Sequence, residues 1–133
     1  MSDVIVSIGI DIIEIRRVRE VLARTPRFRE RVFTERERAY CDSRGEEMAA
    51  QHYAARFAAK EAAFKALRTG WRGSLSWHHV EVTSNEDGAP LLQLSGRARE
   101  LFDALDATHA HLSLSHTSEH AVAQVIFEQN RER

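Results

Sequence analysis

The sequence predicts an α+β fold, a mainly antiparallel sheet packed with a long helix, formed by a single domain spanning residues 1–133. Three observations lead to this prediction. The length of 133 residues, with 43% hydrophobic and 29% charged residues, is typical of one globular domain with its own core. An alanine-rich segment without glycine or proline predicts a helix over residues 46 to about 67. Hydrophobic segments joined by turn residues predict antiparallel strand pairs.

The N-terminal third is expected to begin with a strand and to continue with helices. Residues 4–12 form a nearly continuous β-branched segment, which predicts a strand buried on both faces. A helix is expected from about Glu14 to a Thr-Pro pair at positions 25 and 26, because the residue before a proline disfavours helical geometry. Thr34 is expected to cap a further helix, with Glu37 completing a capping box.

After the long helix, turn residues alternate with strand patterns. Gly70 and Gly73 are expected to bound a loop, and an Asn-Glu-Asp-Gly segment predicts a tight turn. A helix is expected to begin at Ser95 or Gly96 and to reach about residue 105. The remaining expected elements are four strands and a frayed tail, over residues 75–84, 91–94, 111–116, 121–127 and 131–133.

The composition argues against several classes of protein. No apolar segment approaches the ~18 residues that a membrane span needs, so we expect no membrane partner. Cys41 is the only cysteine, which excludes an internal disulfide and fits a reducing cytosol. We therefore expect a cytoplasmic protein, in which Cys41 is a small, partly buried residue and not a nucleophile.

The net charge of −1 conceals a basic segment. Residues 16–44 contain ten arginines and five acidic residues, a net charge of about +5. Such a segment predicts an acidic partner: a nucleic acid, a phosphorylated ligand or an acidic protein. No stacking aromatics accompany the arginines in a pattern typical of single-stranded nucleic-acid binding, which weighs against that partner.

The chain has only two lysines against 17 arginines, and both lie close to Glu61 in the expected long helix. Lys65 is four residues after Glu61 and shares its helix face, whereas Lys60 points about 100° away. A solvated surface ion pair would also explain the spacing of Glu61 and Lys65. The apolar neighbours favour a buried helix, on which an acid and an ammonium are candidates for chemistry.

Two further polar residues lie in apolar strands. Asp11 is within the first strand, where a carboxylate is costly to bury unless it is paired, hydrogen-bonded or bound to a metal. The alternative is a strand end at which Asp11 accepts backbone N–H groups. His116 follows Leu112 and Leu114 on one face of a later strand, and the alternative there is a purely structural histidine.

Asp11 and Glu61, on separate elements with a lysine nearby, suit the chemistry of Mg²⁺ and phosphate. Carboxylate oxygens are hard ligands for Mg²⁺, which usually keeps waters and binds substrate phosphates. An ammonium then neutralises phosphate charge. The other histidines lack accompanying cysteines or a Glu-x-x-His helix, so no zinc site is expected. P-loop, dinucleotide-binding and nucleophile-elbow motifs are missing from the sequence.

Three segments carry a resemblance to a known family. They read IGIDIIEIRR at residues 8–17, RFAAKEAAFKA at residues 56–66 and LSLSH at residues 112–116. In this order and at these spacings they resemble the short, single-unit 4′-phosphopantetheinyl transferases, which include the holo-acyl-carrier-protein synthases. The resemblance covers nearly the whole chain and implies the 4′-phosphopantetheinyl transferase fold.

The resemblance implies an enzyme that transfers 4′-phosphopantetheine from coenzyme A to a serine of apo-acyl carrier protein, releasing 3′,5′-ADP. Such an enzyme would serve fatty-acid or polyketide biosynthesis. Asp11 and Glu61 are then expected to hold Mg²⁺ as the cofactor and to belong to the catalytic site. Lys65 is expected to bind the leaving phosphate, and His116 to lie near the coenzyme. A metal-bound water, Glu61 and Asp11 are all candidates for the general base.

The resemblance also implies how the substrates bind. Members of this length are homotrimers with coenzyme A in clefts between subunits. The helix with Arg17 is expected to dock the acidic carrier protein. Arg68 and Trp71 depart from the family pattern, which implies altered local contacts to the coenzyme. The residues expected to contact coenzyme A are Arg56, Lys60, Lys65, Pro90 and His116, with a structural contact as the alternative for Lys60. Those expected to contact the carrier are Arg16, Arg17 and Arg24.

Two other functions compete with this interpretation. One is a different Mg²⁺-dependent phosphoesterase on the same scaffold, which would cleave coenzyme A without a carrier. The other is a non-catalytic module whose arginines bind an acidic partner, with strongly salt-dependent binding and no metal-dependent turnover.

Overall fold

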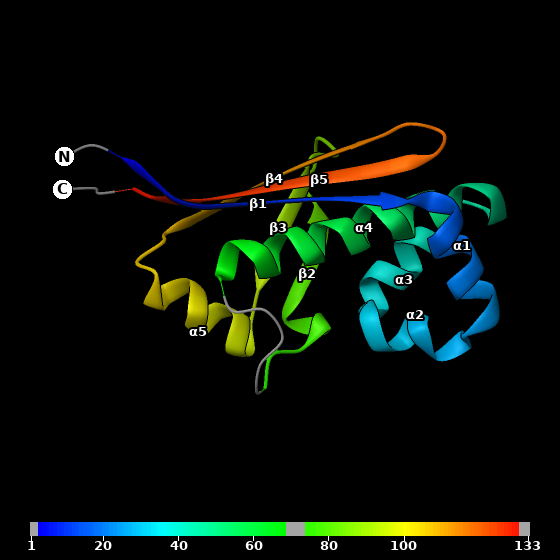
Figure 1. The fold of residues 1–133 in the computed structure, drawn as a ribbon, viewed down its shortest axis with the longest axis horizontal. Coiled ribbons are helices and arrows are strands. Elements are labelled where there is room, and N and C mark those ends of the chain that lie inside the picture. Colours follow the sequence, from blue (N-terminus) through cyan, green and yellow to red (C-terminus); the bar gives the residue numbers. More distant parts are fainter. Residues whose placement is uncertain (1–2, 69–73, 131–133) are drawn as a thin grey trace.

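A 22-residue helix, α4 (Glu46–Leu67), runs through the middle of the structure, which is a computed structural model (Figure 1). The structure describes residues 3–68 and 74–130. The expected helix over residues 46–67 is confirmed, because alanine and other strong helix formers occupy this segment without a glycine or proline. The expected loop at Gly70–Gly73, Trp71 and the tail at 131–133 lie outside the described residues.

A three-stranded antiparallel sheet lies along one side of α4 (Figure 1). Its order is β1 (Val4–Glu14), β5 (His120–Gln129) and β4 (His109–His116), so β1 and β4 are its two edges. The register pairs Asp11 with Ala123 and Ala123 with Leu114. The expected antiparallel pairing is thereby confirmed, and both late strands extend beyond their expected bounds.

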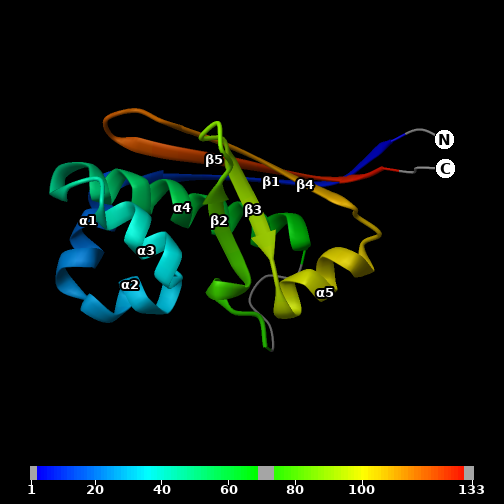
Figure 2. The same cartoon turned by 180° about the vertical axis from the view of Figure 1, so that it is seen from behind.

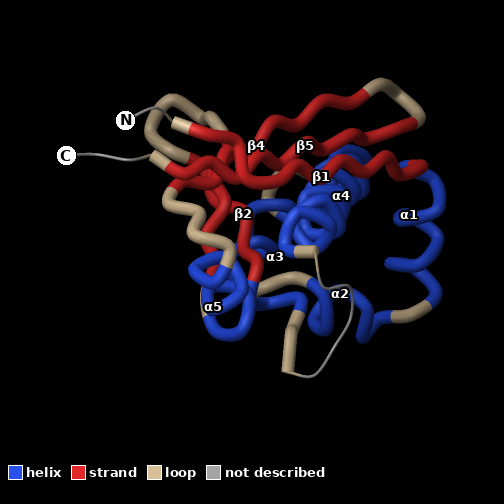
Figure 3. Tube along the Cα trace, turned by 60° about the vertical axis from the view of Figure 1, so that its left-hand side comes forward, coloured by secondary structure: helices blue, strands red, loops and turns tan. Residues whose placement is uncertain are grey.

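The short helices lie on the opposite side of α4, whereas a hairpin crosses beside α4 and reaches β4 (Figures 2 and 3). Three short helices follow β1: α1 (Ile15–Arg24), α2 (Pro26–Val32) and α3 (Glu35–Asp42). The hairpin of β2 (Val80–Ser84) and β3 (Pro90–Leu94) leads into α5 (Gly96–Ala104). The capping box of Thr34 and Glu37 is present as expected, and the Asn85 side chain accepts two backbone N–H groups within the hairpin turn.

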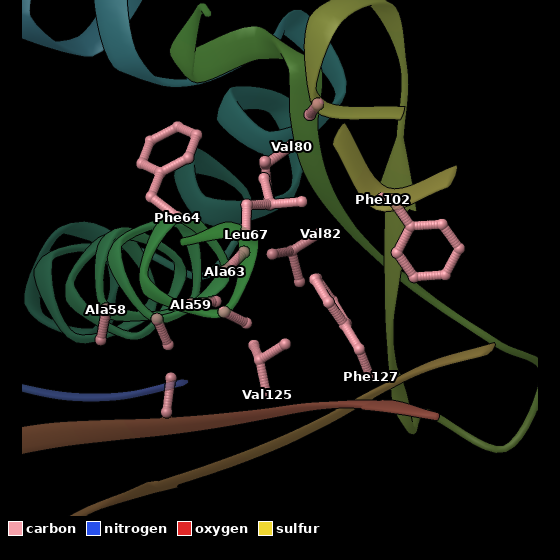
Figure 4. Packing of buried hydrophobic residues seen from close by; sticks show 14 of the residues in the cluster. Ala58, Ala59, Ala63, Phe64, Leu67, Val80, Val82, Phe102, Val125 and Phe127 are labelled. Carbon is pink, nitrogen blue, oxygen red and sulfur yellow. The ribbon is translucent and has the colours of Figure 1, made fainter. Parts of the chain in front are cut away.

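Small side chains allow α4 to lie close to the sheet. Figure 4 shows Ala58 and Ala59 directed toward the strands and Phe64 directed away from them. On β1, a Cβ atom at Gly9 would overlap the carbonyl oxygen of Ala62, so only glycine permits this approach. The Ser7 hydroxyl donates to the Ala66 carbonyl at 2.7 Å and fixes the two elements along their length.

The expectation that β1 is buried on both faces was wrong. Ser7 and Gly9 are buried against α4, whereas Ile8, Ile10 and Ile12 on the other face are each more than half exposed. The reason is that β1 is an edge strand and that no described helix or strand covers the outer face of this sheet (Figure 1). None of the described helices is long and apolar enough to cross a membrane.

The expected strand over residues 75–84 is shorter than predicted. A 3₁₀ turn, η1 (Trp77–His79), precedes β2, because Ser76 caps it by accepting the N–H group of His78. The His79 ring accepts the N–H group of Ser76 in return. His78 and His79 therefore lie within this turn and not in the expected strand.

Candidate active site

The close contact between β1 and α4 brings Asp11, Glu61 and Lys65 together. The Lys65 ammonium donates to the Asp11 carboxylate at 3.1 Å and to the backbone carbonyl of Ile10 at 2.9 Å. Asp11 is the better buried partner, with 13% of its side chain exposed against 56% for Lys65. The helix face that carries Glu61 and Lys65, as predicted, is therefore directed toward Asp11 of β1.

The pKa of Glu61 is raised in part by a second carboxylate nearby. Partial burial raises the pKa of the Glu61 carboxyl, and the negative charge of Asp11 raises it further. Lys65 acts in the opposite direction. Two neighbouring carboxylates with one ammonium leave net negative charge at the site, which a cation would neutralise.

The residues present fit a hard divalent cation. One oxygen of Asp11, Oδ2, is buried without a hydrogen-bond partner, and buried acceptors of this kind are normally satisfied. Within residues 3–68 and 74–130, no three His, Cys, Asp or Glu side chains are grouped as a metal site. Asp11 and Glu61 together offer carboxylate oxygens to such a cation, and Mg²⁺ usually completes its shell with water and substrate oxygens.

His116 is not part of this group within one chain. It ends β4, opposite Ala121 of β5, and β5 separates it from β1. Its side chain is exposed. The charge of His116 acts on His52 of α4: burial lowers the pKa of His52, and the charges of Arg56, Arg44 and His116 lower it further.

A separate cluster of basic side chains, here called the cationic cluster, surrounds Tyr40. The guanidinium groups of Arg44 and Arg56 lie over its ring at 4.7 and 4.2 Å, and the His52 ring packs against it at 5.5 Å. Arg56 is 5% exposed, and its Nε atom is buried without a hydrogen-bond partner. Together these groups form a candidate anion site.

A cavity of about 220 Å³ adjoins this cluster. Arg36 and Arg56 line it together with the hydroxyl-bearing residues Thr83 and Ser84. Pro90 is the strand partner of Ser84, so this predicted coenzyme contact lies at the same end of the hairpin. The structure thus brings Arg56 and Pro90 into one region, although they are 34 positions apart in the sequence.

The prediction of a coenzyme contact for Lys60 was wrong. Its side chain is fully buried and forms an ion pair with the equally buried Glu37 at 2.9 Å. The ammonium also donates to the carbonyl groups of Trp77, at 3.0 Å, and Val80. Burial lowers the pKa of Lys60, and Glu37 opposes that shift. A side chain with no exposed surface cannot meet a coenzyme phosphate.

The predicted carrier-binding arginines lie on α1. Arg16 is exposed and lies 3.9 Å from Glu20, and Arg24 is exposed in the last turn. Arg17 lines a largely apolar cavity of about 450 Å³ between β1, α1, α2 and α4. Its other lining residues include Ile13, Val18, Val21, Phe28 and Phe57.

Sequence reasoning missed several residues that build the site. Gly9, Ser7 and His52 gave no motif of their own, although a glycine inside a strand is a signal of close backbone approach. Arg68, noted as a departure from the family, donates to the carbonyl of Val6 at 2.9 Å and so joins the end of α4 to β1. Cys41 is fully buried, and burial raises its pKa to about 12, consistent with an inert thiol.

Comparison with known proteins places these features in a family context. The family model of the 4′-phosphopantetheinyl transferase superfamily matches residues 7–125. The holo-[acyl-carrier-protein] synthase of Trichlorobacter lovleyi is 48% identical over 125 residues, covering 93% of this chain and 98% of the relative. That of Koribacter versatilis is 44% identical with the same coverage.

Solved structures of similar proteins agree with the fold. The holo-(acyl-carrier-protein) synthase of Bacillus anthracis, in complex with CoA (3′,5′-ADP), matches with a TM-score of 0.78 and 39% identity. The match covers 95% of this chain and 98% of that one. The holo-[acyl-carrier-protein] synthase of Helicobacter pylori in complex with coenzyme A matches with a TM-score of 0.76 and 31% identity, covering 90% and 98% of the chains.

Proposed function

The chain belongs to the 4′-phosphopantetheinyl transferase superfamily, and from this premise we propose that it is a holo-acyl-carrier-protein synthase. It transfers the 4′-phosphopantetheine group of coenzyme A to a serine of apo-acyl carrier protein and releases 3′,5′-ADP. The relatives carry this activity in their names, and two similar structures contain the coenzyme. The convergence of Asp11, Glu61 and Lys65 is the observation that carries the proposal.

In the proposed reaction, the serine oxygen of the carrier forms a bond to the β-phosphorus of coenzyme A. The bond from that phosphorus to the oxygen bridging the two phosphates breaks, and 3′,5′-ADP leaves with the electron pair. The serine proton passes to a base, for which Asp11 and Glu61 are the carboxylates in the site. Lys65 is more than half exposed, so its ammonium can meet the charge that builds on the leaving phosphate.

Asp11 and Glu61 are proposed to hold Mg²⁺. When bound, Mg²⁺ would polarise the pyrophosphate oxygens as a Lewis acid. Two observations support this assignment: Asp11 Oδ2 is a buried acceptor without a partner even though Oδ1 is paired with Lys65, and burial and Asp11 raise the pKa of Glu61 despite the opposing charge of Lys65. The ion pair with Lys65 holds the Asp11 side chain in place.

The cationic cluster is proposed to bind a phosphate of coenzyme A. Arg56 supports this role because its guanidinium is held rigidly over Tyr40 and retains an unpartnered Nε atom. Thr83, Ser84 and Pro90 would lie beside the same ligand. Fixed, partly desolvated guanidinium groups bind phosphate well because little side-chain freedom is lost.

A homotrimer is proposed as the active form. The outer face of the sheet carries a row of exposed isoleucines on β1, and exposed apolar rows of this kind mark protein interfaces. In one chain, His116 and Asp11 lie on opposite edge strands. A site shared between neighbouring subunits would bring His116 of one subunit to the carboxylate pair of the next.

The carrier protein is proposed to dock on α1. Arg16, Arg17 and Arg24 offer positive charge to an acidic helix, and the apolar cavity beside Arg17 can receive one apolar side chain of the carrier. This combination of a charged rim and an apolar centre is typical of protein interfaces. The reaction would take place in the cytoplasm and serve fatty-acid or polyketide synthesis.

Release of 3′,5′-ADP distinguishes the proposed transferase from the alternatives. Coenzyme A and Mg²⁺ are incubated with the protein, with and without apo-acyl carrier protein, and 3′,5′-ADP is measured by chromatography. The proposal requires release that depends on the carrier. Release at the same rate without the carrier would indicate a phosphoesterase instead, and no release in either case would exclude both enzymes.

A further inference from the structure

A buried ion pair lies next to the proposed metal ligands without contacting them. Lys60 and Glu37 are both fully buried, and their charged groups are 2.9 Å apart. Lys60 precedes Glu61 in α4, so the two side chains leave the helix about 100° apart. Lys60 is directed toward α3 and β2, whereas Glu61 is directed toward the side where β1 supplies Asp11.

The ion pair connects four elements through hydrogen bonds. One oxygen of Glu37 accepts from the backbone N–H of Thr34 at 2.9 Å, and the other accepts from that of Val82 at 2.7 Å. The Lys60 ammonium donates to the carbonyls of Trp77 and Val80 on the segment entering β2. Because hydrogen bonds are directional, these contacts fix the position of the Lys60 ammonium relative to α3, η1 and β2. They thereby restrain α4, which carries Lys60.

The alanine-rich face of α4 restrains rotation of the helix less than this network does, although Ser7 bonds to Ala66 and Lys65 bonds to Asp11 along it. Toward the sheet, its buried surface consists mainly of alanine methyl groups, which allow close approach to β1. Methyl groups of equal size distinguish poorly between small rotations of the helix about its axis, because such rotations exchange one methyl contact for another. Glu61 and Lys65 would move with every such rotation.

We propose that Lys60 and Glu37 are positioning residues that set the rotation of α4 and thereby aim Glu61 at Asp11. The inference rests on the proposed function, since it concerns Glu61 as a metal ligand. A buried ion pair adds little net stability compared with apolar side chains of similar size, and fixing the register of a helix is its best-attested use. Residues that orient a metal ligand typically change metal affinity or activity by about 10- to 100-fold when they are replaced.

The test compares Lys60→Met with Phe102→Leu, a control in α5. Phe102 is buried against Phe127, so its truncation destabilises the fold without touching the contacts of Lys60. Lys60→Arg is the second variant: it keeps a cation for Glu37 and so leaves no unpaired buried carboxylate, but its larger head group displaces α4. Each protein is examined at a temperature at which it is fully folded, judged from its thermal unfolding curve.

The first measurement is Mn²⁺ binding in the presence of coenzyme A. The free ion is quantified by electron paramagnetic resonance. The second is transfer to the carrier, resolved into kcat and KM. We expect Lys60→Met, or Lys60→Arg if the former does not fold, to weaken Mn²⁺ binding and to lower kcat by about 10-fold or more. The KM for the carrier should change less than kcat, because the arginines proposed to dock the carrier lie on α1, which the hydrogen bonds of Lys60 do not involve.

Wild-type Mn²⁺ affinity and kcat in a folded Lys60 variant would overturn the inference, as would equal losses in Phe102→Leu at a matched drop in melting temperature. A wild-type protein that binds Mn²⁺ with coenzyme A yet transfers nothing would contradict the proposed function. The two failures are therefore distinguishable.

Discussion

The carboxyl groups of Asp11 and Glu61 are unfavourable neighbours until a cation joins them. Burial and the charge of Asp11 both raise the pKa of Glu61, and only Lys65 opposes this effect. A site that binds a cation tightly is expected to cost stability while the cation is absent, because the charges that bind it repel one another.

Replacing Glu61 by Gln should therefore separate stability from activity. Because the folded-state pKa is raised, ionised Glu61 lowers stability at pH values above that pKa, and the effect vanishes below the unfolded-state value of about 4.3. Glu61→Gln should raise the melting temperature of the metal-free protein at neutral pH, but not at strongly acid pH, and should abolish transfer. Thermal unfolding with and without Mg²⁺ measures this, and exposed Glu86→Gln serves as the control. A lower melting temperature for Glu61→Gln at neutral pH would contradict the account.

The same raised pKa predicts how the Mg²⁺ requirement depends on pH. A metal binds the carboxylate and not the carboxylic acid, so protons compete with Mg²⁺ once the pH falls toward the pKa of Glu61. The Mg²⁺ concentration that gives half-maximal transfer should increase from neutral to mildly acid pH. Titrations of activity with Mg²⁺ at several pH values test this, and a half-saturating concentration independent of pH would count against Glu61 as a ligand.

The roles of individual residues could be predicted where they depend on spacing along one helix. They could not be predicted where they depend on which side chains the fold buries together. The i,i+4 spacing predicted that Glu61 and Lys65 share a face, and the structure adds Asp11 as their neighbour. Helical geometry also placed Lys60 on another face. It could not reveal that Glu37, 23 positions earlier, lies opposite Lys60, because that contact depends on the packing of α3 against α4.

The contact between β1 and α4 is the element-scale feature on which the site depends. Gly9, Ser7 and Arg68 each bring the strand and the end of the helix together, by close approach and by hydrogen bonds at 2.7 and 2.9 Å. A shift of β1 away from α4 would separate Asp11 from Glu61 even if both elements stayed intact.

Gly9→Ala should consequently reduce both stability and transfer. The added methyl group overlaps the Ala62 carbonyl, so β1 must move, at a cost of about 3 kcal/mol. Gly45→Ala is the control for backbone strain: its methyl group meets no atom within 4 Å, but its backbone, with φ +92° and ψ 157°, costs a residue other than glycine about 1–3 kcal/mol. Chemical denaturation and transfer assays measure both effects, and folded Gly45→Ala should keep its transfer activity. Equal losses of transfer in the two folded variants would show that the close approach at Gly9 is not important.

Helices whose bounds depend on composition and capping residues matched their predictions. The burial of β1 and the length of β2 did not, because they depend on contacts with distant parts of the chain. The alanine-rich composition predicted α4, and the Thr34 capping box predicted the start of α3. The apolar segment of β1 predicted two buried faces because sequence does not show what covers each face. Residues 77–79 turned out to form a 3₁₀ turn since Ser76 and His79 cap it reciprocally.

At the scale of the whole molecule, one chain has Asp11 on one edge strand of the sheet, beside Glu61 of α4, and His116 on the other edge strand. The isoleucines on the outer face of β1 remain exposed, so the chain offers a surface for further copies. These two observations lead to the same expectation of a site completed between subunits, which no local sequence pattern could show.

Mixing of two inactive variants tests this expectation. Glu61→Gln and His116→Ala should each have strongly reduced transfer alone. Co-expressed in equal amounts, they should recover about a quarter of wild-type activity, because random assembly places an intact Glu61 beside an intact His116 at that fraction of interfaces. A mixture no more active than the sum of its parts would place both residues in the same subunit.

Mass spectrometry of the carrier shows whether the proposed transfer takes place. Apo-acyl carrier protein is incubated with coenzyme A, Mg²⁺ and either the wild-type protein or the Asp11→Asn/Glu61→Gln double variant. We expect the wild-type protein to add one phosphopantetheine group to the carrier and the folded double variant to add none. An unmodified carrier with the wild-type protein would contradict the proposed reaction, and full modification by the double variant would contradict the assignment of the two carboxylates.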